Sequence, residues 1–186
     1  NEYIVRKTTV GFMNFMVKQY DNALEKGCVI AYDCRRGSVE FSKAAAQVLA
    51  SNGMKVYLFT ALRPTPELSF AVRHLKCAGG IMITASHNPP QYNGYKVYDD
   101  EGCQLIPHLA DSVTNEVNNV TDMFNIEVRP YEELVKEGKI LEINELVDAP
   151  YLEAVKTIPV NKVKKDNIKI VYTPLHGTGN IPARRV

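Results

Sequence analysis

A short polar loop follows one apolar run of the sequence and carries residue types that perform chemistry. The run GGIMITA reads as a buried strand, and Ser86, His87 and Asn88 come almost directly after it. Two prolines then stiffen the chain, an Asn-Gly turn reverses it, and Lys96 lies just beyond the turn. A serine, a histidine and a lysine on one loop could support nucleophilic or phosphoryl-transfer chemistry. The same residues could also shape a plain hairpin.

The residues around Ser86 disfavour a serine-hydrolase site. A hydrolase serine needs a general base within hydrogen-bond reach and usually a G-x-S-x-G turn, and TASHN has neither glycine. His87 is adjacent in sequence, which is an awkward position from which to remove the proton of Ser86. A phosphorylated serine is the alternative, because it carries about −1.5 to −2 charges near neutral pH and needs cations around it. Lys96, Arg35 and His87 are suitable types, and a divalent metal ion would complete the set.

Alternating helices and strands are predicted to position this loop. Helices are predicted over residues 3–20, 39–50, 67–77, 106–120, 131–137 and 144–158. Strands are predicted over residues 28–33, 54–59, 79–85 and 95–99, the last as an antiparallel edge strand. Ser38 is expected to cap the second helix. This alternation is typical of βαβ units, so we expect an α/β fold with a mixed, mainly parallel sheet flanked by helices.

Four strand-end loops are rich in polar residues: YDCRRGS, TALRPTP, TASHNPPQYNGYK and YTPLHGTG. Ligands of open α/β sheets gather at the carboxyl ends of the strands, so these loops could converge on one site. Arg35, which follows Asp33, is a good bidentate partner for a phosphate. For Arg63 and Thr65 a strand-to-helix connection is favoured over direct catalysis. His176 lies in LHGTG, which matches neither glycine-rich phosphate motif, and a structural or interdomain role is favoured for it.

Composition and charge exclude several classes of protein. The chain has 186 residues, 45% of them hydrophobic, which is enough for a buried core. A net charge of +1 gives no reason to expect nucleic acid or an anionic membrane as a partner. The four cysteines form no CxxC pair, which disfavours a zinc framework and a disulfide scaffold. Three of them lie in or beside predicted strands and are expected to be buried thiols. No apolar run approaches ~20 residues, and we expect a cytoplasmic protein.

The serine loop resembles that of a known family. TASHNPPQYNGYK is similar to the phosphoserine loop of the α-D-phosphohexomutase superfamily, the phosphoglucomutases and phosphomannomutases. YDCRRGS matches the family element D-x-R-x-x-S, and RPTPEL, GGIMITASHNPP and YTPLHGTG follow the family's order and approximate spacing. The resemblance spans essentially the whole chain and fits the phosphoglucomutase/phosphopentomutase-like branch best.

The resemblance implies an enzyme that interconverts hexose 1-phosphate and hexose 6-phosphate, with glucose as the expected sugar. The reaction would run through a phosphoserine and a 1,6-bisphosphate, with glucose 1,6-bisphosphate as activator. By position, Ser86 would be the phosphorylated residue and, through its phosphate, one ligand of Mg²⁺. Lys96 and Arg35 would serve proton transfer and charge stabilisation. His87 and Asn88 would contact phosphate or substrate.

Several family motifs are absent from the chain. These are the D-G-D-x-D-R loop that completes the Mg²⁺ site, the G-E-x-S-G sugar loop, a C-terminal phosphate loop and a preceding F-G-T-x-G-x-R-G segment. We therefore expect a fragment of a four-domain enzyme that is inactive alone. Residues 1–160 would form domain 1 without its N-terminal segment. Residues 161–186 would form a linker and the first strand of a second, similar domain.

The expected partners are a sugar phosphate and the remaining domains of the parent chain. Mannose, pentose and amino-sugar phosphates stay open as substrates beside glucose. A non-catalytic module that binds sugar phosphates or other anions is the alternative function.

Overall fold

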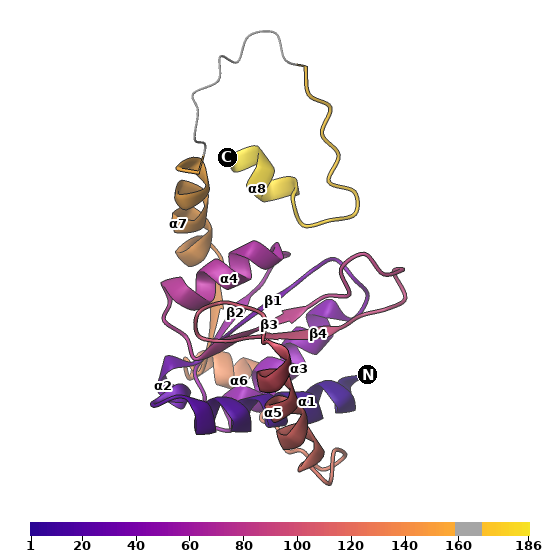
Figure 1. Ribbon diagram of the computed structural model, residues 1–186, viewed down its shortest axis with the longest axis vertical. Helices are drawn as coiled ribbons and strands as arrows, with labels where there is room; N and C mark the ends of the chain where they lie inside the picture. Colours follow the sequence, from indigo (N-terminus) through magenta and orange to yellow (C-terminus); the bar gives the residue numbers. More distant parts are fainter. Residues whose placement is uncertain (159–168) are drawn as a thin grey trace.

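The computed structural model describes residues 1–158 and 169–186, and a five-stranded sheet forms its centre (Figure 1). The strands are β1 (Cys28–Tyr32), β2 (Val56–Phe59), β3 (Gly79–Ile83), β4 (Tyr95–Tyr98) and β5 (Ile140–Ile143). They lie in the order β4-β3-β1-β2-β5. Every neighbouring pair is parallel except β3 and β4. The predicted mixed, mainly parallel α/β fold is confirmed.

Helices cover both faces of the sheet. They are α1 (Glu2–Gln19), α2 (Ala23–Lys26), α3 (Ser38–Ser51), α4 (Thr65–His74), α5 (Pro107–Asn118), α6 (Tyr131–Lys136), α7 (Glu145–Lys156) and α8 (Asn180–Arg185). One core cluster joins α1, α3, α5 and α6 to one face, and a second joins α4 and α7 to the other (Figure 1). All residues of β1, β2 and β3 are buried, as expected of parallel strands that are covered on both faces.

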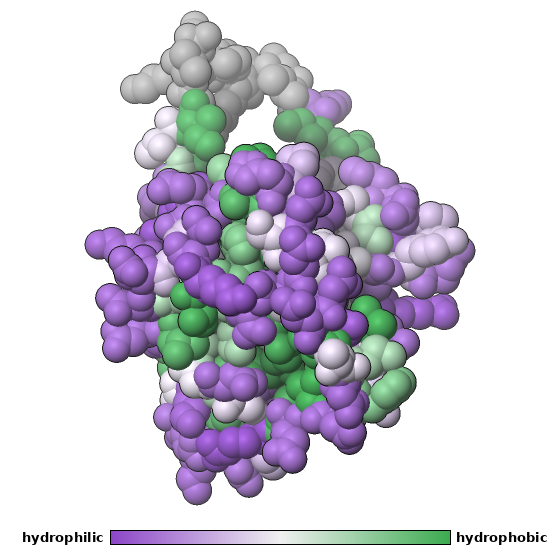
Figure 2. All heavy atoms as spheres, turned by 60° about the horizontal axis from the view of Figure 1, so that its bottom comes forward, coloured by the Kyte–Doolittle hydropathy of each residue, from purple (hydrophilic) through white to green (hydrophobic). Residues whose placement is uncertain are grey.

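The face of the molecule that carries α1 and α5 is mainly polar. Figure 2 views the molecule from the side of α1 and α5, where polar residues cover most of the surface and apolar side chains show between them. No helix among the described residues is long and apolar enough to cross a membrane. Cys28 and Cys77 are buried, whereas Cys34 and Cys103 are exposed on loops.

Two local predictions differ from the structure near the sheet. Ser38 is the first residue of α3 rather than its cap, because Gly37 takes the cap position with a left-handed φ of 75°. The hydroxyl of Ser38 bonds the carboxylate of Asp33 instead. Strand β5 was not predicted. It has four residues, of which the first and the last are buried, and so short a segment before a helix gives little apolar signal.

The C-terminal segment also departs from expectation. The first strand of a second domain, expected within residues 161–186, is not formed in the described part, where Ile170 and Val171 are 81% and 97% exposed. No described strand lies beside them to supply hydrogen bonds and apolar contacts. A short helix, α8, follows GTG instead. The predicted domain boundary between residues 160 and 161 lies outside the described residues, so the division into domains stays a prediction.

Candidate active site

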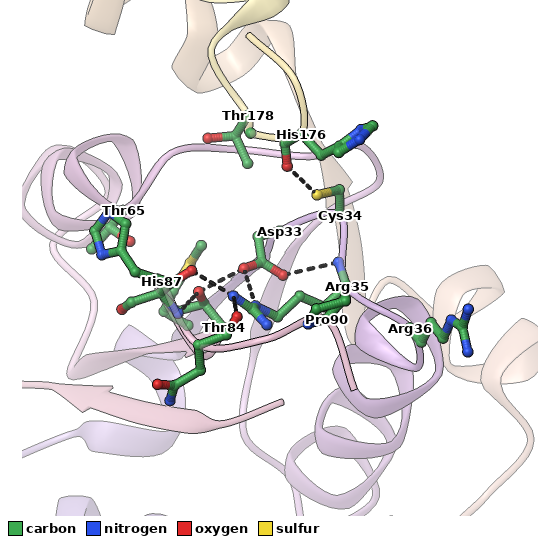
Figure 3. A pocket seen from close by; sticks show the side chains of 14 residues that line it. Asp33, Cys34, Arg35, Arg36, Thr65, Thr84, His87, Pro90, His176 and Thr178 are labelled. Carbon is green, nitrogen blue, oxygen red and sulfur yellow. Dashed lines mark hydrogen bonds and ion pairs between the residues drawn. The ribbon is translucent and has the colours of Figure 1, made fainter. Parts of the chain in front are cut away.

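A cavity of about 660 Å³ lies at the carboxyl ends of β1 and β3 (Figure 3). Its lining comes from the loop after β1, the loop after β3, Thr65 at the start of α4, and residues 176–178. All four polar loops that stand out in the sequence therefore contribute to one cavity. Four of the predicted site residues line it: Arg35, Ser86, His87 and Asn88.

Ser86 and Lys96 are in direct contact beside this cavity. The antiparallel pairing of β3 and β4 places Lys96 opposite Met82. The Nζ of Lys96 donates a hydrogen bond to the Oγ of Ser86 at 2.7 Å. Gly94 permits the close return of the chain, because a Cβ on it would lie 2.7 Å from the carbonyl oxygen of Thr84. The expected turn thus brings the lysine to the serine.

Arg35 uses its donors on the serine loop itself. Its Nη1 and Nη2 donate to four backbone carbonyls at 2.5 to 3.0 Å, those of Ser86, Asn88, Pro89 and Tyr92. Its Nε donates to the carboxylate of Asp33 at 3.2 Å. A guanidinium has five N–H donors, so all of them are engaged. In this conformation Arg35 shapes the loop, and any stabilisation of a reacting group would come from its charge alone.

Asp33 connects the loop after β1 to the loop after β3. Its Oδ1 accepts hydrogen bonds from the backbone N–H of Arg35 and the hydroxyl of Ser38. Its Oδ2 accepts from the Nε of Arg35 and, at 2.6 Å, from the hydroxyl of Thr84. Asn93 adds a further link by donating to the hydroxyl of Ser38. Sequence reasoning missed Thr84 and Asn93, because one reads as the end of a strand and the other as a turn residue.

His87 and Asn88 are exposed and line the cavity. No described residue forms a hydrogen bond with the side chain of either one. Their backbones belong to the loop that Arg35 holds, since the carbonyl of Asn88 accepts from the Nη2 of Arg35. These side chains are therefore available to a ligand in the cavity.

The C-terminal segment closes the cavity on the side opposite Thr84 and His87 (Figure 3). The thiol of Cys34 donates to the backbone carbonyl of His176, which ties this segment to the loop after β1. The contact involves the backbone of His176 and not its ring. Thr178 is the other labelled residue of this side.

Arg63, the arginine that follows β2, lies in a separate buried cluster. Its Nε and Nη2 donate to both carboxylate oxygens of Asp148 at 2.7 Å, and its Nη2 also donates to Asn144. Glu67 lies 3.7 Å away from the Nε of Arg63 and is 2% exposed. Burial, followed by the hydrogen bond and negative charge of Asp148, raises the pKa of Glu67 to about 8. Arg185 of α8 reaches the same Asp148 carboxylate at 3.5 Å.

The described residues do not form a metal site by themselves. No group of three or more histidine, cysteine, aspartate or glutamate side chains in residues 1–158 and 169–186 could hold a metal ion. Asp33 lines the cavity, but its two oxygens already accept four hydrogen bonds, which is about the capacity of a carboxylate.

Several curated proteins are similar to this chain. A phosphoglucomutase of Staphylococcus saprophyticus is 39% identical over 178 residues, which cover 96% of this chain and 32% of that protein. The human phosphopentomutase is 34% identical over 192 residues, covering 97% of this chain and 31% of that protein. The chain thus spans about a third of the length of these relatives.

Solved structures and a family description agree with these relatives. A Thermus thermophilus crystal structure that bears the name phosphomannomutase superposes with a TM-score of 0.65 at 31% identity, over 84% of this chain and 32% of that one. A phosphoglucomutase/phosphomannomutase family protein from Burkholderia thailandensis shares the fold, with a TM-score of 0.63 at 21% identity, over 85% of this chain and 32% of that one. Residues 1–123 match the family described as "Phosphoglucomutase/phosphomannomutase, alpha/beta/alpha domain I". The chain belongs to the phosphoglucomutase/phosphomannomutase family.

Proposed function

We propose that the full-length protein is a phosphosugar mutase that interconverts hexose 1-phosphate and hexose 6-phosphate, with glucose as the preferred sugar. The observation that carries this proposal is the 2.7 Å contact between the Lys96 ammonium and the Ser86 hydroxyl beside a cavity. Relatives named phosphoglucomutase support the choice of sugar. Because the chain spans about a third of those relatives, it is expected to be inactive alone. The proposed location of the full-length protein is the cytoplasm.

Ser86 carries a phosphoryl group in the proposed mechanism and passes it to a hydroxyl of the bound hexose phosphate. The new phosphorus–oxygen bond forms on the sugar as the bond to the Oγ of Ser86 breaks, which gives a hexose 1,6-bisphosphate. Lys96 gives a proton to the leaving Oγ and receives the proton of the attacking hydroxyl, so protons and charge balance. The bisphosphate then reorients and returns its other phosphoryl group to Ser86 by the reverse step.

The remaining residues of the loop serve binding and shape. His87 and Asn88 contact the phosphate or the sugar, since their side chains line the cavity and are not engaged by any described residue. Arg35 holds the loop through the carbonyls that accept its N–H groups, and one of these is the carbonyl of Ser86 itself.

Mg²⁺ is the proposed metal of the full-length enzyme, and it would neutralise charge on the transferred phosphoryl group. The phosphate on Ser86 would supply one ligand. The described residues do not fit a complete Mg²⁺ site, because they contain no cluster of three suitable side chains. The other ligands would come from other parts of the full-length protein.

The test follows the conversion of glucose 1-phosphate into glucose 6-phosphate by the full-length protein, with glucose 1,6-bisphosphate as activator. We expect turnover by the wild type and a mass increase of roughly 80 Da, one phosphoryl group, on the peptide that contains Ser86. Ser86→Ala should abolish both. Ser112→Ala on α5 is the matched control, because Ser112 is exposed and its hydroxyl bonds the carbonyl of His108 on the same helix. An active Ser86→Ala variant would contradict the role of Ser86.

A pentose phosphate is the second candidate substrate, favoured by the 34% identity to the human phosphopentomutase. Ribose 1-phosphate and mannose 1-phosphate assayed beside glucose 1-phosphate decide between them by kcat/KM. The alternative outside catalysis is a module that only binds sugar phosphates. That alternative predicts saturable binding of glucose 6-phosphate with no mass increase on Ser86 after incubation with the bisphosphate.

A further inference from the structure

Ser86 has an unusual backbone conformation for a residue that is not glycine. Its φ is 53°, in the left-handed region, and it follows a strand whose residues are extended. Side chains with a Cβ avoid this region unless surrounding contacts hold them there. The conformation also sets the direction of the Oγ, which meets the Nζ of Lys96 at 2.7 Å. The contacts that hold the Ser86 backbone therefore bear on its chemistry.

Those contacts form a closed ring of hydrogen bonds. The N–H of Ser86 donates to the hydroxyl oxygen of Thr84 at 2.9 Å, and that hydroxyl donates to Asp33 Oδ2 at 2.6 Å. The carbonyl of Ser86 accepts from the Nη2 of Arg35 at 2.5 Å. The Nε of Arg35 returns to the same Oδ2 at 3.2 Å. Both backbone groups of Ser86 are thus tied to one carboxylate oxygen.

Each hydrogen bond of the ring has a fixed donor and acceptor. At position 84 a side-chain hydroxyl is required to fill both roles. Its oxygen must accept from the N–H of Ser86 while its hydrogen goes to Asp33, and valine of the same shape can do neither. Thr84 is 5% exposed, so water has little access to substitute for the lost hydroxyl. Asp33 cannot turn away either, because its other oxygen is held by Ser38 and the backbone of Arg35.

We propose that Thr84 and Asp33 are positioning residues for phosphoryl transfer, which hold Ser86 in its left-handed conformation so that its Oγ keeps one place during both halves of the reaction. This proposal rests on the proposed function. The bisphosphate must reorient between the two steps, whereas the serine must give up and receive a phosphoryl group at the same point. A ring that fixes both the N–H and the C=O of Ser86 meets that requirement.

The test compares Thr84→Val with Thr84→Ser in the full-length protein. We expect Thr84→Val to lower kcat roughly 100-fold, as a misplacement of about 1 Å does, with a smaller change in the KM for glucose 1-phosphate. Thr84→Ser should restore kcat to within about threefold of wild type, because it keeps the hydroxyl. Thr114→Val on α5, whose hydroxyl bonds the carbonyl of Ala110, is the matched control and should leave kcat unchanged. A Thr84→Val enzyme as active as Thr84→Ser would overturn the proposal.

A structural readout keeps this test separate from the test of the function. The amide N–H of Ser86 should exchange with solvent faster in Thr84→Val, and the crystal structure of that variant should show φ of Ser86 outside the left-handed region. An unchanged positive φ would overturn the positioning role even if kcat falls. Asp33→Asn provides a second variant if Thr84→Val does not fold, and the same faster exchange and lower kcat are expected. If the wild type has no mutase activity, the proposed function fails. The exchange and φ measurements then still show whether Thr84 and Asp33 hold the backbone of Ser86.

Discussion

Two arginines of this chain follow neighbouring parallel strands. One of them holds the geometry of the serine loop, and the other stabilises the fold. Arg35 follows β1 and donates to four backbone carbonyls of one exposed loop. Arg63 follows β2 and donates to the side chains of Asp148 and Asn144, which lie more than 80 residues further along the chain. Each guanidinium also pairs with one carboxylate, Asp33 for Arg35 and Asp148 for Arg63, but the Asp148 pair is more deeply buried and most partners of Arg35 are neutral carbonyls.

The difference in partners predicts different consequences of losing each arginine. Removal of Arg63 leaves the carboxylate of Asp148 buried beside Glu67 with the more distant Arg185 at 3.5 Å, and a buried charge that loses its close partner is costly. Removal of Arg35 frees carbonyls on an exposed loop, where water can replace the lost donors, and Asp33 keeps its hydrogen bonds from the hydroxyls of Ser38 and Thr84. Arg63 therefore contributes mainly to the stability of the domain, and Arg35 mainly to the geometry of the serine loop. An arginine beside a candidate phosphate site can bind the phosphate directly only if some of its N–H donors are not already engaged by the protein.

The largest effect on stability is expected for Arg63→Met. The variant keeps the apolar stem but takes two hydrogen bonds of 2.7 Å from the Asp148 carboxylate and leaves it the 3.5 Å contact with Arg185, so the free energy of unfolding should fall by about 3–5 kcal/mol. Chemical denaturation of the full-length protein measures the change. Arg73→Met is the control, because Arg73 is exposed and its bonds to described residues go to Ser69 and the carbonyl of Glu101, neither of them charged. Equal losses of unfolding free energy in the two variants would contradict a special contribution of the buried Arg63 to stability.

Arg35→Lys should show the opposite pattern, with a large loss of activity and a small loss of stability. Lysine keeps the positive charge but cannot reproduce a planar fork that reaches Asp33 and the loop carbonyls together. We expect kcat to fall roughly 100-fold through misplacement of Ser86, with a midpoint of unfolding close to that of wild type. Assay of glucose 1-phosphate conversion and thermal unfolding of the same sample check both halves. A fully active Arg35→Lys enzyme would mean that charge alone suffices at this position.

The contact between Ser86 and Lys96 could be predicted from the sequence because it is local. A strand, a stiff loop and an Asn-Gly turn lie within a few residues of each other, and the turn geometry returns the lysine to the serine. The α/β class could be predicted for a similar reason, since helix and strand periodicities are properties of short segments.

The roles of the two arginines could not be predicted, because each depends on distant acceptors. The sequence supplies a guanidinium after β1 but does not say that four carbonyls of the loop after β3 will take its donors. Asp148, the partner of Arg63, lies 85 positions away on a helix whose neighbour β5 was itself not predicted. Thr84 reads as the end of an apolar strand, and only the folded loop shows that its hydroxyl joins Asp33 to Ser86.

Glu67→Gln tests the charge of the Arg63 cluster, because the wild-type glutamate changes its charge with pH and glutamine does not. The folded pKa of Glu67 is about 8 against an ordinary value of 4.5, so between these values the folded state holds a proton that the unfolded state has lost. The free energy of unfolding should therefore fall as pH rises from about 4.5 through about 8. Glutamine cannot ionise, so the variant should lose this dependence and be more stable than wild type above pH 8. Thermal unfolding midpoints measured at several pH values test this, and parallel curves for the two proteins would contradict it.

The smallest effect is expected for Arg185→Met, which tests whether α8 reaches the Arg63 cluster. Arg185 pairs with Glu145 and lies 3.5 Å from Asp148, and its positive charge lowers the pKa of Glu67. Because the ion pair with Glu145 is exposed, its loss should change stability at neutral pH very little. Loss of the positive charge should nonetheless move the titration of Glu67 upward, which shifts the fall in stability to higher pH. Arg184→Met, the adjacent exposed arginine, should leave the curve of unfolding midpoint against pH unchanged. If both variants give the wild-type curve, Arg185 does not act on the cluster and the contact of α8 with α7 has no energetic consequence there.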